Sequence, residues 1–219
     1  MIQPQVFSFL TALKVNNNRD WFEKNRNKYE AALKSVTDHV EKLIVILSEE
    51  DEALKGITLK DCMFRIYRDV RFSHNKTPYK SHFSAAFAAG GKSSPLPGFY
   101  MHIEPGACFF AGGVWHPEAE QLAAIRQEIV YNEDEFRRII KEKDFVKYFK
   151  KLDEEDVLKK NPKGFEKDHP AIDLLKYKSY TVTHEFQDEK ALDKNFAAYA
   201  VKVFRAMKPL NAFLKRSTD

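Results

Sequence analysis

The chain of 219 residues is 43% hydrophobic and 31% charged, and its formal net charge is +4. These values exclude an intrinsically disordered chain, and so small an excess of positive charge does not by itself indicate a nucleic-acid partner. The sequence has neither a signal-peptide pattern nor the roughly 20 consecutive apolar residues of a membrane span. We therefore expect a cytoplasmic protein with no membrane partner.

The N-terminal part of the chain is predicted to form two helices. A short helix over residues 3–14 is followed by an asparagine turn, in which Asn18 is a suitable N-cap for the next helix. The long second helix carries one apolar stripe at helical spacing. The stripe consists of Phe22, Tyr29, Leu33, Val36, Val40, Leu43 and Leu47. We expect this stripe to cover one face of a sheet.

Alternating apolar and polar residues predict β-strands in the centre of the chain. Four strands are expected, over residues 64–72, 83–89, 99–104 and 107–111. Because short loops connect them, they should form an antiparallel meander. Several helices are expected between residues 118 and 175. A fifth strand over residues 176–185 and a long helix that starts at Asp188 complete the pattern.

This order of elements predicts an α+β fold rather than βαβ winding. An antiparallel sheet of about five strands would pack against the long N- and C-terminal helices, with a helical insertion between strands four and five. The length and the lack of a linker predict that residues 1–219 form a single domain.

Residues 64–82, FRIYRDVRFSHNKTPYKSH, form a cationic segment that contains one acidic residue, Asp69. One aspartate cannot neutralise five lysines and arginines, and guanidinium groups suit phosphate or carboxylate oxygens. We therefore predict that an anionic small molecule binds in an arginine-rich cleft. The predicted ligand-binding residues are Arg65, Arg68, Arg71, Asn75, Lys76, Tyr79, Lys80 and Trp115.

Two other interpretations of the cationic segment stay open. In one, the arginines form an internal ion-pair network, in which Asp69 holds one of them and Glu104 or Glu23 holds another. In the other, the protein is a nucleic-acid-binding module, in which Tyr67, Tyr79 and Trp115 stack on bases. The chain contains no known motif for binding DNA or RNA.

A second candidate motif is His102-x-Glu104, which places both side chains on one face of a predicted strand beside Tyr100. This spacing could present two metal ligands, or an acid/base residue and the group that orients it. A third metal ligand could come from His82, His116 or His169. Since no Cys/His cluster supports a metal, no metal site is predicted, and the simplest role for Glu104 is to pair with an arginine.

If the protein is an enzyme, His102 is the candidate acid/base, and Glu104 and Asp69 complete the predicted catalytic residues. The sequence leaves open whether there is a reaction at all, and it does not indicate a cofactor or an oligomeric state.

Several motifs are similar to those of a known family. Arg65-x-x-Arg68-Asp69-x-Arg71-Phe72, followed by Asn75-Lys76 and Tyr79, resembles the signature of the domain-of-unknown-function 2461 family, an uncharacterised bacterial family. The similarity extends over nearly the whole chain, through residues 18–22, 102–106, 112–115, 162–165 and 168–170. The resemblance implies a single domain of about this length, and it does not supply a chemistry.

Overall fold

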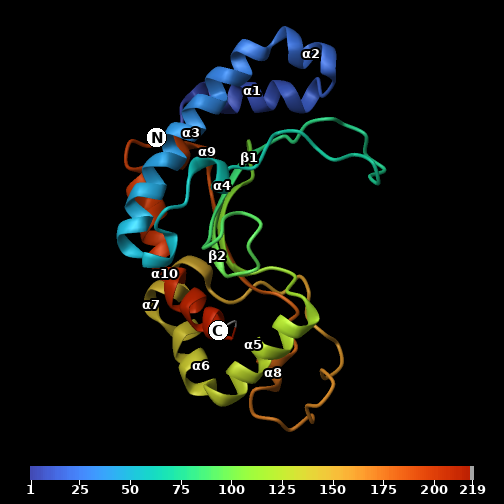
Figure 1. The fold of residues 1–219 in the computed structure, drawn as a ribbon, viewed down its shortest axis with the longest axis vertical. Coiled ribbons are helices and arrows are strands. Elements are labelled where there is room, and N and C mark those ends of the chain that lie inside the picture. Colours follow the sequence, from blue (N-terminus) through green and yellow to red (C-terminus); the bar gives the residue numbers. More distant parts are fainter. Residues whose placement is uncertain (218–219) are drawn as a thin grey trace. The chain divides into compact units, whose positions relative to one another are not determined.

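The computed structural model describes residues 1–217, and Figure 1 shows their helices and strands. The chain forms two compact units that alternate along the sequence. The first unit comprises Met1–Ser93, Tyr100–Phe110 and Glu185–Val201, and the second comprises Ser94–Phe99, Ala111–His184 and the chain from Lys202 onward. The single domain expected from the sequence stays a prediction.

The strands form one antiparallel sheet of four strands, in the order β1-β2-β3-β4. The strands are β1 (Phe83–Phe87), β2 (Gly98–Ile103), β3 (Cys108–Val114) and β4 (Tyr180–Phe186). Neighbours in the sheet are therefore neighbours in the chain, as expected for a meander. Together with the helices, this sheet confirms the α+β class that the order of elements predicted.

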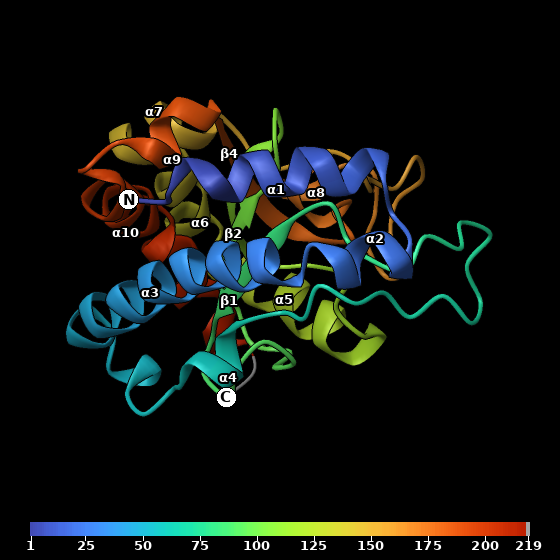
Figure 2. The ribbon, with the colours of Figure 1, turned by 90° about the horizontal axis from the view of Figure 1, so that it is seen from above.

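The first unit begins with three helices, α1 (Pro4–Val15), α2 (Arg19–Lys24) and α3 (Arg26–Glu50), of which α1 and α3 lie side by side (Figure 2). Asn18 caps α2 as predicted, because its side chain accepts a hydrogen bond of 2.9 Å from the backbone N–H of Trp21. The prediction of a single long helix after Asn18 is wrong, because the helix is interrupted at Asn25. Asn25 departs from helical geometry (φ −114°, ψ 19°), and its side chain donates to the backbone oxygen of Trp21 at 2.9 Å.

The apolar stripe of α3 lies in the core of the first unit. Its buried members include Val36, Val40, Leu43 and Leu47, and α3 packs on β1. An aromatic cluster joins the helices to β1, and its members are Phe9, Phe22, Tyr29, Tyr79 and Phe83. The remaining elements with residues in this unit are η1 (Glu52–Leu54), α4 (Leu59–Cys62), α9 (Asp188–Leu192) and the start of α10 (Phe196–Arg216).

The strand predicted over residues 64–72 does not form, so the prediction of about five strands is wrong. This stretch makes two isolated bridges, Met63 with Ala85 and Tyr67 with Tyr79. Between the two bridges, the first stretch of chain runs four residues, from 63 to 67, whereas the opposite stretch runs six residues, from 79 to 85. The two extra residues shift the register, and a continuous ladder cannot form across them.

A side chain, rather than a further strand, satisfies the backbone of Tyr79. The Asn17 side chain donates to the carbonyl oxygen of Tyr79 at 2.9 Å and accepts from its N–H at 3.1 Å. The neighbouring Pro78 has no N–H to donate, which also disfavours a regular strand here. Asn17 thus links the turn between α1 and α2 to the chain that leads into β1.

In the sequence, helices α5 (Ala119–Tyr131), α6 (Glu133–Lys141), α7 (Lys143–Phe149) and α8 (Ile172–Leu175) lie between β3 and β4. In the core of the second unit, Phe136 packs edge-on against Tyr180 and Phe213. Helix α10 continues through Pro209 to Arg216 and does not end at the proline. Within residues 1–217, no helix combines the length and the apolar character that a membrane crossing needs.

His39 is a buried polar residue on α3 that the apolar pattern did not reveal. It is 3% exposed, its ring stacks on Phe196 at 4.8 Å, and neither ring nitrogen has a hydrogen-bond partner among the described residues. Burial, with the positive charges of the N-terminus and Lys42, lowers the pKa of His39 to about 3. The folded protein therefore keeps this ring neutral at pH values where an unfolded chain protonates it.

Replacing His39 should make the protein more resistant to acid. Between about pH 6.5 and pH 3 the unfolded chain binds a proton at His39 that the folded protein does not bind, so stability falls as the pH falls. His39→Leu changes the free energy of unfolding by some amount at pH 7.5. At pH 4.5 this change should be more favourable to the folded state by about 2 to 3 kcal/mol. Urea denaturation at both pH values measures this difference. The control is His74→Leu, which replaces an exposed histidine. If the unfolding free energies of the wild type and His39→Leu change with pH in parallel, the explanation is contradicted.

Candidate functional site

The cationic segment, residues 64–82, belongs to the first unit and forms an extended loop between α4 and β1. Figures 1 and 2 show it in teal, as the chain leaves α4, turns and returns to β1. Three backbone hydrogen bonds hold the base of the loop together: Phe64 N to Ser84 O, Arg68 N to Pro78 O, and Lys80 N to Ile66 O. The loop tip, with Ser73 and His74, lies beyond these bonds.

Only one of the five lysines and arginines in the cationic segment forms an ion pair within the described residues. Arg71 binds Asp69 with two guanidinium nitrogens, and the shortest contact is 2.7 Å. Hydrogen bonds from the Arg71 side chain and backbone lower the pKa of Asp69. Asp69 thus neutralises Arg71, and no contact places it beside His102.

Neutral oxygens hold two other cations of the segment. Arg68 donates to the backbone oxygen and the hydroxyl of Thr77, and to the Ser73 hydroxyl at 3.4 Å. Lys76 donates to the backbone oxygen of Val70 at 3.0 Å. These bonds fix the shape of the loop without neutralising its charge, so the loop remains strongly positive.

The structure gives Glu104 and Glu23 partners other than the arginines of the segment. Glu23 pairs with Arg26 on the next helix at 2.6 Å. Glu104 accepts a hydrogen bond of 2.7 Å from the Ser81 hydroxyl and lies 3.8 Å from the Lys14 ammonium. Neither glutamate therefore joins the predicted arginine network.

The polar face of β2 carries a chain of hydrogen-bonded side chains. Because side chains alternate along a strand, Tyr100, His102 and Glu104 share one face, as the sequence predicted. The Tyr100 hydroxyl lies 3.1 Å from His102 Nδ1, and His102 Nε2 lies 3.1 Å from Glu104 Oε2. On the other face of β2, Met101 and Ile103 are fully buried.

His82, the last residue of the cationic segment and the one before β1, lies beside this chain. Its ring centroid lies 4.1 Å from that of His102. One nitrogen of each histidine and one oxygen of Glu104 lie within 4.8 Å of one another. We call these three residues, His82, His102 and Glu104, the His–Glu cluster. The ring of Phe109 stacks on His102 at 4.5 Å and closes one side of it.

The protonation states in the His–Glu cluster follow from burial and hydrogen bonding. Burial, with smaller effects from His102 and Lys80, lowers the pKa of His82 to about 4. Burial also lowers the pKa of His102, although Glu104 opposes this change. Burial raises the pKa of Glu104, but hydrogen bonds from Ser81 and His102 lower it by more. At neutral pH the cluster thus holds two neutral imidazoles and one carboxylate.

Lys80 lies close enough to the His–Glu cluster for its charge to act on both histidines, and Arg65 is a neighbour of Lys80. The Lys80 ammonium lies 5.3 Å from the ring centre of Phe64. Burial, followed by the charge of Arg65, lowers the pKa of Lys80. Within residues 1–217, no carboxylate lies within 4.0 Å of either cation. Arg65 and Lys80 are therefore neighbouring positive charges with no carboxylate in direct contact within residues 1–217, and Arg65 acts on Asp69 only from a greater distance.

The other predicted site residues lie elsewhere. The Asn75 side chain accepts from the backbone and hydroxyl of Thr77 and so shapes the loop. Tyr79 is 4% exposed and stacks on Phe22 at 4.0 Å, which makes it part of the core. Trp115 is 73% exposed and belongs to the second unit.

Sequence reasoning missed two residues that contact the His–Glu cluster and did not single out a third that belongs to it. His82 was one of three alternatives for a metal ligand, and Ser81 and Lys14 were not considered. The alternation of Phe83, which is buried in the aromatic cluster, with His82 would have placed the histidine on the polar face.

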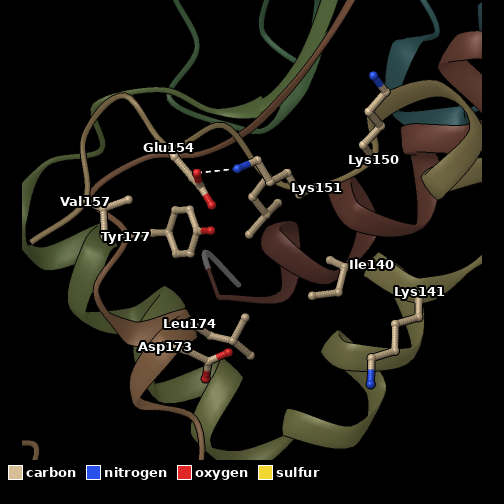
Figure 3. A pocket seen from close by; sticks show the side chains of 10 residues that line it. Ile140, Lys141, Lys150, Lys151, Glu154, Val157, Asp173, Leu174 and Tyr177 are labelled. Carbon is tan, nitrogen blue, oxygen red and sulfur yellow. Dashed lines mark hydrogen bonds and ion pairs between the residues drawn. The ribbon is translucent and has the colours of Figure 1, made fainter.

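The second unit contains a separate pocket of about 650 Å³ (Figure 3). Lys151 and Glu154 form an ion pair in its wall, and Tyr177 and Leu174 also line it. None of the residues predicted from the sequence to bind a ligand lines this pocket.

Fold and site together describe an α+β protein with a half-buried histidine–carboxylate cluster beside a cationic loop. A family model described as "Conserved hypothetical protein (DUF2461)" matches residues 5–213. The chain belongs to this family, which confirms the resemblance found in the sequence. Comparisons with curated proteins and with solved structures gave no match.

The burial of Tyr79 can be tested by mutation. Tyr79→Ala should lower the free energy of unfolding by about 3 kcal/mol, because it empties a space beneath Phe22. Tyr79→Phe keeps the ring and should cost less than about 1 kcal/mol. Chemical denaturation measures both values. Equal and small effects would show that the ring is not part of the core.

Proposed function

We propose that the protein binds a small phosphate- or carboxylate-bearing ligand beside the His–Glu cluster, with Arg65 and Lys80 as the first contacts. The observation that carries this proposal is the proximity of these two cations without a neutralising carboxylate. Two like charges repel each other, and an anion between them would relieve that repulsion and gain two charge-assisted hydrogen bonds.

The positive electrostatic potential of the rest of the cationic segment supports this proposal. Arg68 and Lys76 keep their full charge because they donate to neutral oxygens, so they raise the positive potential around the loop. Arg71 contributes less, since Asp69 neutralises it. An exposed cationic loop of this kind attracts anions from solution and concentrates them near Arg65 and Lys80.

The neighbouring histidines suit a reaction on the bound ligand. Glu104 contacts one nitrogen of His102, Nε2, and so orients the ring, while the Tyr100 hydroxyl lies beside the other, Nδ1. In the proposed function the ligand would displace the Tyr100 hydroxyl from Nδ1, His102 would transfer a proton to or from the ligand there, and Glu104 would hold the ring in place.

Anion titrations test the binding site. Inorganic phosphate, pyrophosphate and citrate should each be added at low ionic strength while thermal unfolding is followed. At a concentration 100 times the Kd, a ligand should stabilise the wild type by about 2.7 kcal/mol. The double substitution Arg65→Gln, Lys80→Met should abolish this stabilisation while it keeps the aliphatic parts of both side chains.

The matched control is Arg19→Gln, Lys28→Met, which removes the same charge from exposed positions on α2 and α3. The control should respond to anions like the wild type. If no anion stabilises the wild type, or if both double variants respond alike, the proposal fails. A short single-stranded oligonucleotide that binds far more tightly than phosphate, with a steep dependence on salt, would instead support a nucleic-acid-binding module.

A further inference from the structure

The geometry points to a divalent transition-metal site formed by His82, His102 and Glu104. It rests on the arrangement of these three side chains and does not depend on anion binding by Arg65 and Lys80. One ligand atom of each residue lies within 4.8 Å of the other two, and His102 Nε2 lies 3.1 Å from Glu104 Oε2. A tetrahedral zinc ion with bonds of about 2.1 Å holds its ligand atoms about 3.4 Å apart. Small side-chain rotations are therefore sufficient to form the site.

The types of donor atom indicate which metals fit. Two imidazoles and one carboxylate suit zinc and other first-row divalent ions, whereas magnesium and calcium prefer oxygen ligands alone. With three protein ligands, a zinc ion keeps a fourth position for water or a substrate, as in catalytic zinc sites. A structural zinc site would have four protein ligands, and within residues 1–217 the group contains three.

Neighbouring side chains already orient two of the three ligands. The Tyr100 hydroxyl is next to His102 Nδ1, which leaves Nε2 to face Glu104. With a metal on Nε2, Nδ1 would carry the ring proton and donate it to the Tyr100 oxygen. Ser81 binds Glu104 Oε1 and leaves Oε2 to face His102. Outer contacts of this kind fix the tautomer and the angle of metal ligands.

The surroundings would both hold the site and leave it accessible. β1 and β2 are adjacent in the sheet, so His82 and His102 lie on neighbouring stretches of backbone. Phe109 covers one face of the His102 ring. The side chains of His102 and Glu104 are 10% and 18% exposed, so solvent still reaches the site. Lys14, 3.8 Å from Glu104 Oε1, is the cation nearest the carboxylate, and it contacts the oxygen that faces away from His102.

The test is metal binding by the full-length protein after treatment with a chelator. Titration with zinc should give one site per chain by calorimetry, and cobalt(II) should give the visible absorption of a four- or five-coordinate ion. His82→Gln and Glu104→Gln should each weaken zinc binding at least 100-fold. Ser81→Ala and Tyr100→Phe, which change only the outer contacts, should weaken it 10- to 100-fold.

Two controls separate this site from the proposed anion site. His74→Gln replaces an exposed histidine of the same loop and should bind zinc like the wild type. Arg65→Gln, Lys80→Met should also keep zinc binding although it loses anion binding. Circular dichroism checks that each variant is folded. The inference is overturned if the wild type binds less than one zinc per chain, or if His82→Gln and Glu104→Gln bind it unchanged, because the cluster is then only a structural hydrogen-bonded group.

Discussion

The candidate site depends on the hydrogen bonds that satisfy a half-buried carboxylate. Glu104 is largely removed from water, so its charge must be compensated by donors within hydrogen-bond distance. His102 supplies one donor from β2 itself, and Ser81 supplies another from the end of the cationic segment. Because Ser81 and His82 are consecutive, the bond that satisfies Glu104 also brings His82 to His102. A single electrostatic requirement thus ties the loop to the sheet and assembles the cluster.

In the cationic segment, some arginine and lysine side chains are held in position without having their charge neutralised. Contacts with carbonyl and hydroxyl oxygens fix the position of Arg68 and Lys76, while their charges are not neutralised. Arg71, in contrast, is both positioned and neutralised by Asp69. The loop can therefore hold a defined shape before any ligand binds, which reduces the ordering cost of binding. Lys80, whose charge acts on both histidines of the His–Glu cluster, has Arg65 as a positively charged neighbour.

The sequence predicted the α+β class, the positions of the four strands that form, and the shared face of His102 and Glu104, because alternation and short loops are local properties. It failed at residues 64–72, where alternation was present but the pairing register shifts by two residues. It also missed the break at Asn25, where the backbone leaves helical geometry without a proline or glycine to mark the position. Besides His102, the partners of Glu104 come from residues 14 and 81, and such distant contacts leave no local pattern. Tyr79 was assigned to the ligand as a member of the cationic segment, although its neighbours in space are aromatic.

The pair of hydrogen bonds between Asn17 and Tyr79 has a consequence for association between molecules. The bonds of Arg68 and Lys80 leave the N–H and the carbonyl of Tyr79 directed away from Tyr67, like the free groups of an edge strand. Such free groups can pair with a strand of another molecule. The primary amide of Asn17 offers one donor and one acceptor and so takes the place of that strand. One side chain in the turn between α1 and α2 thereby blocks the backbone of Tyr79 from intermolecular pairing, shortly before the chain enters β1.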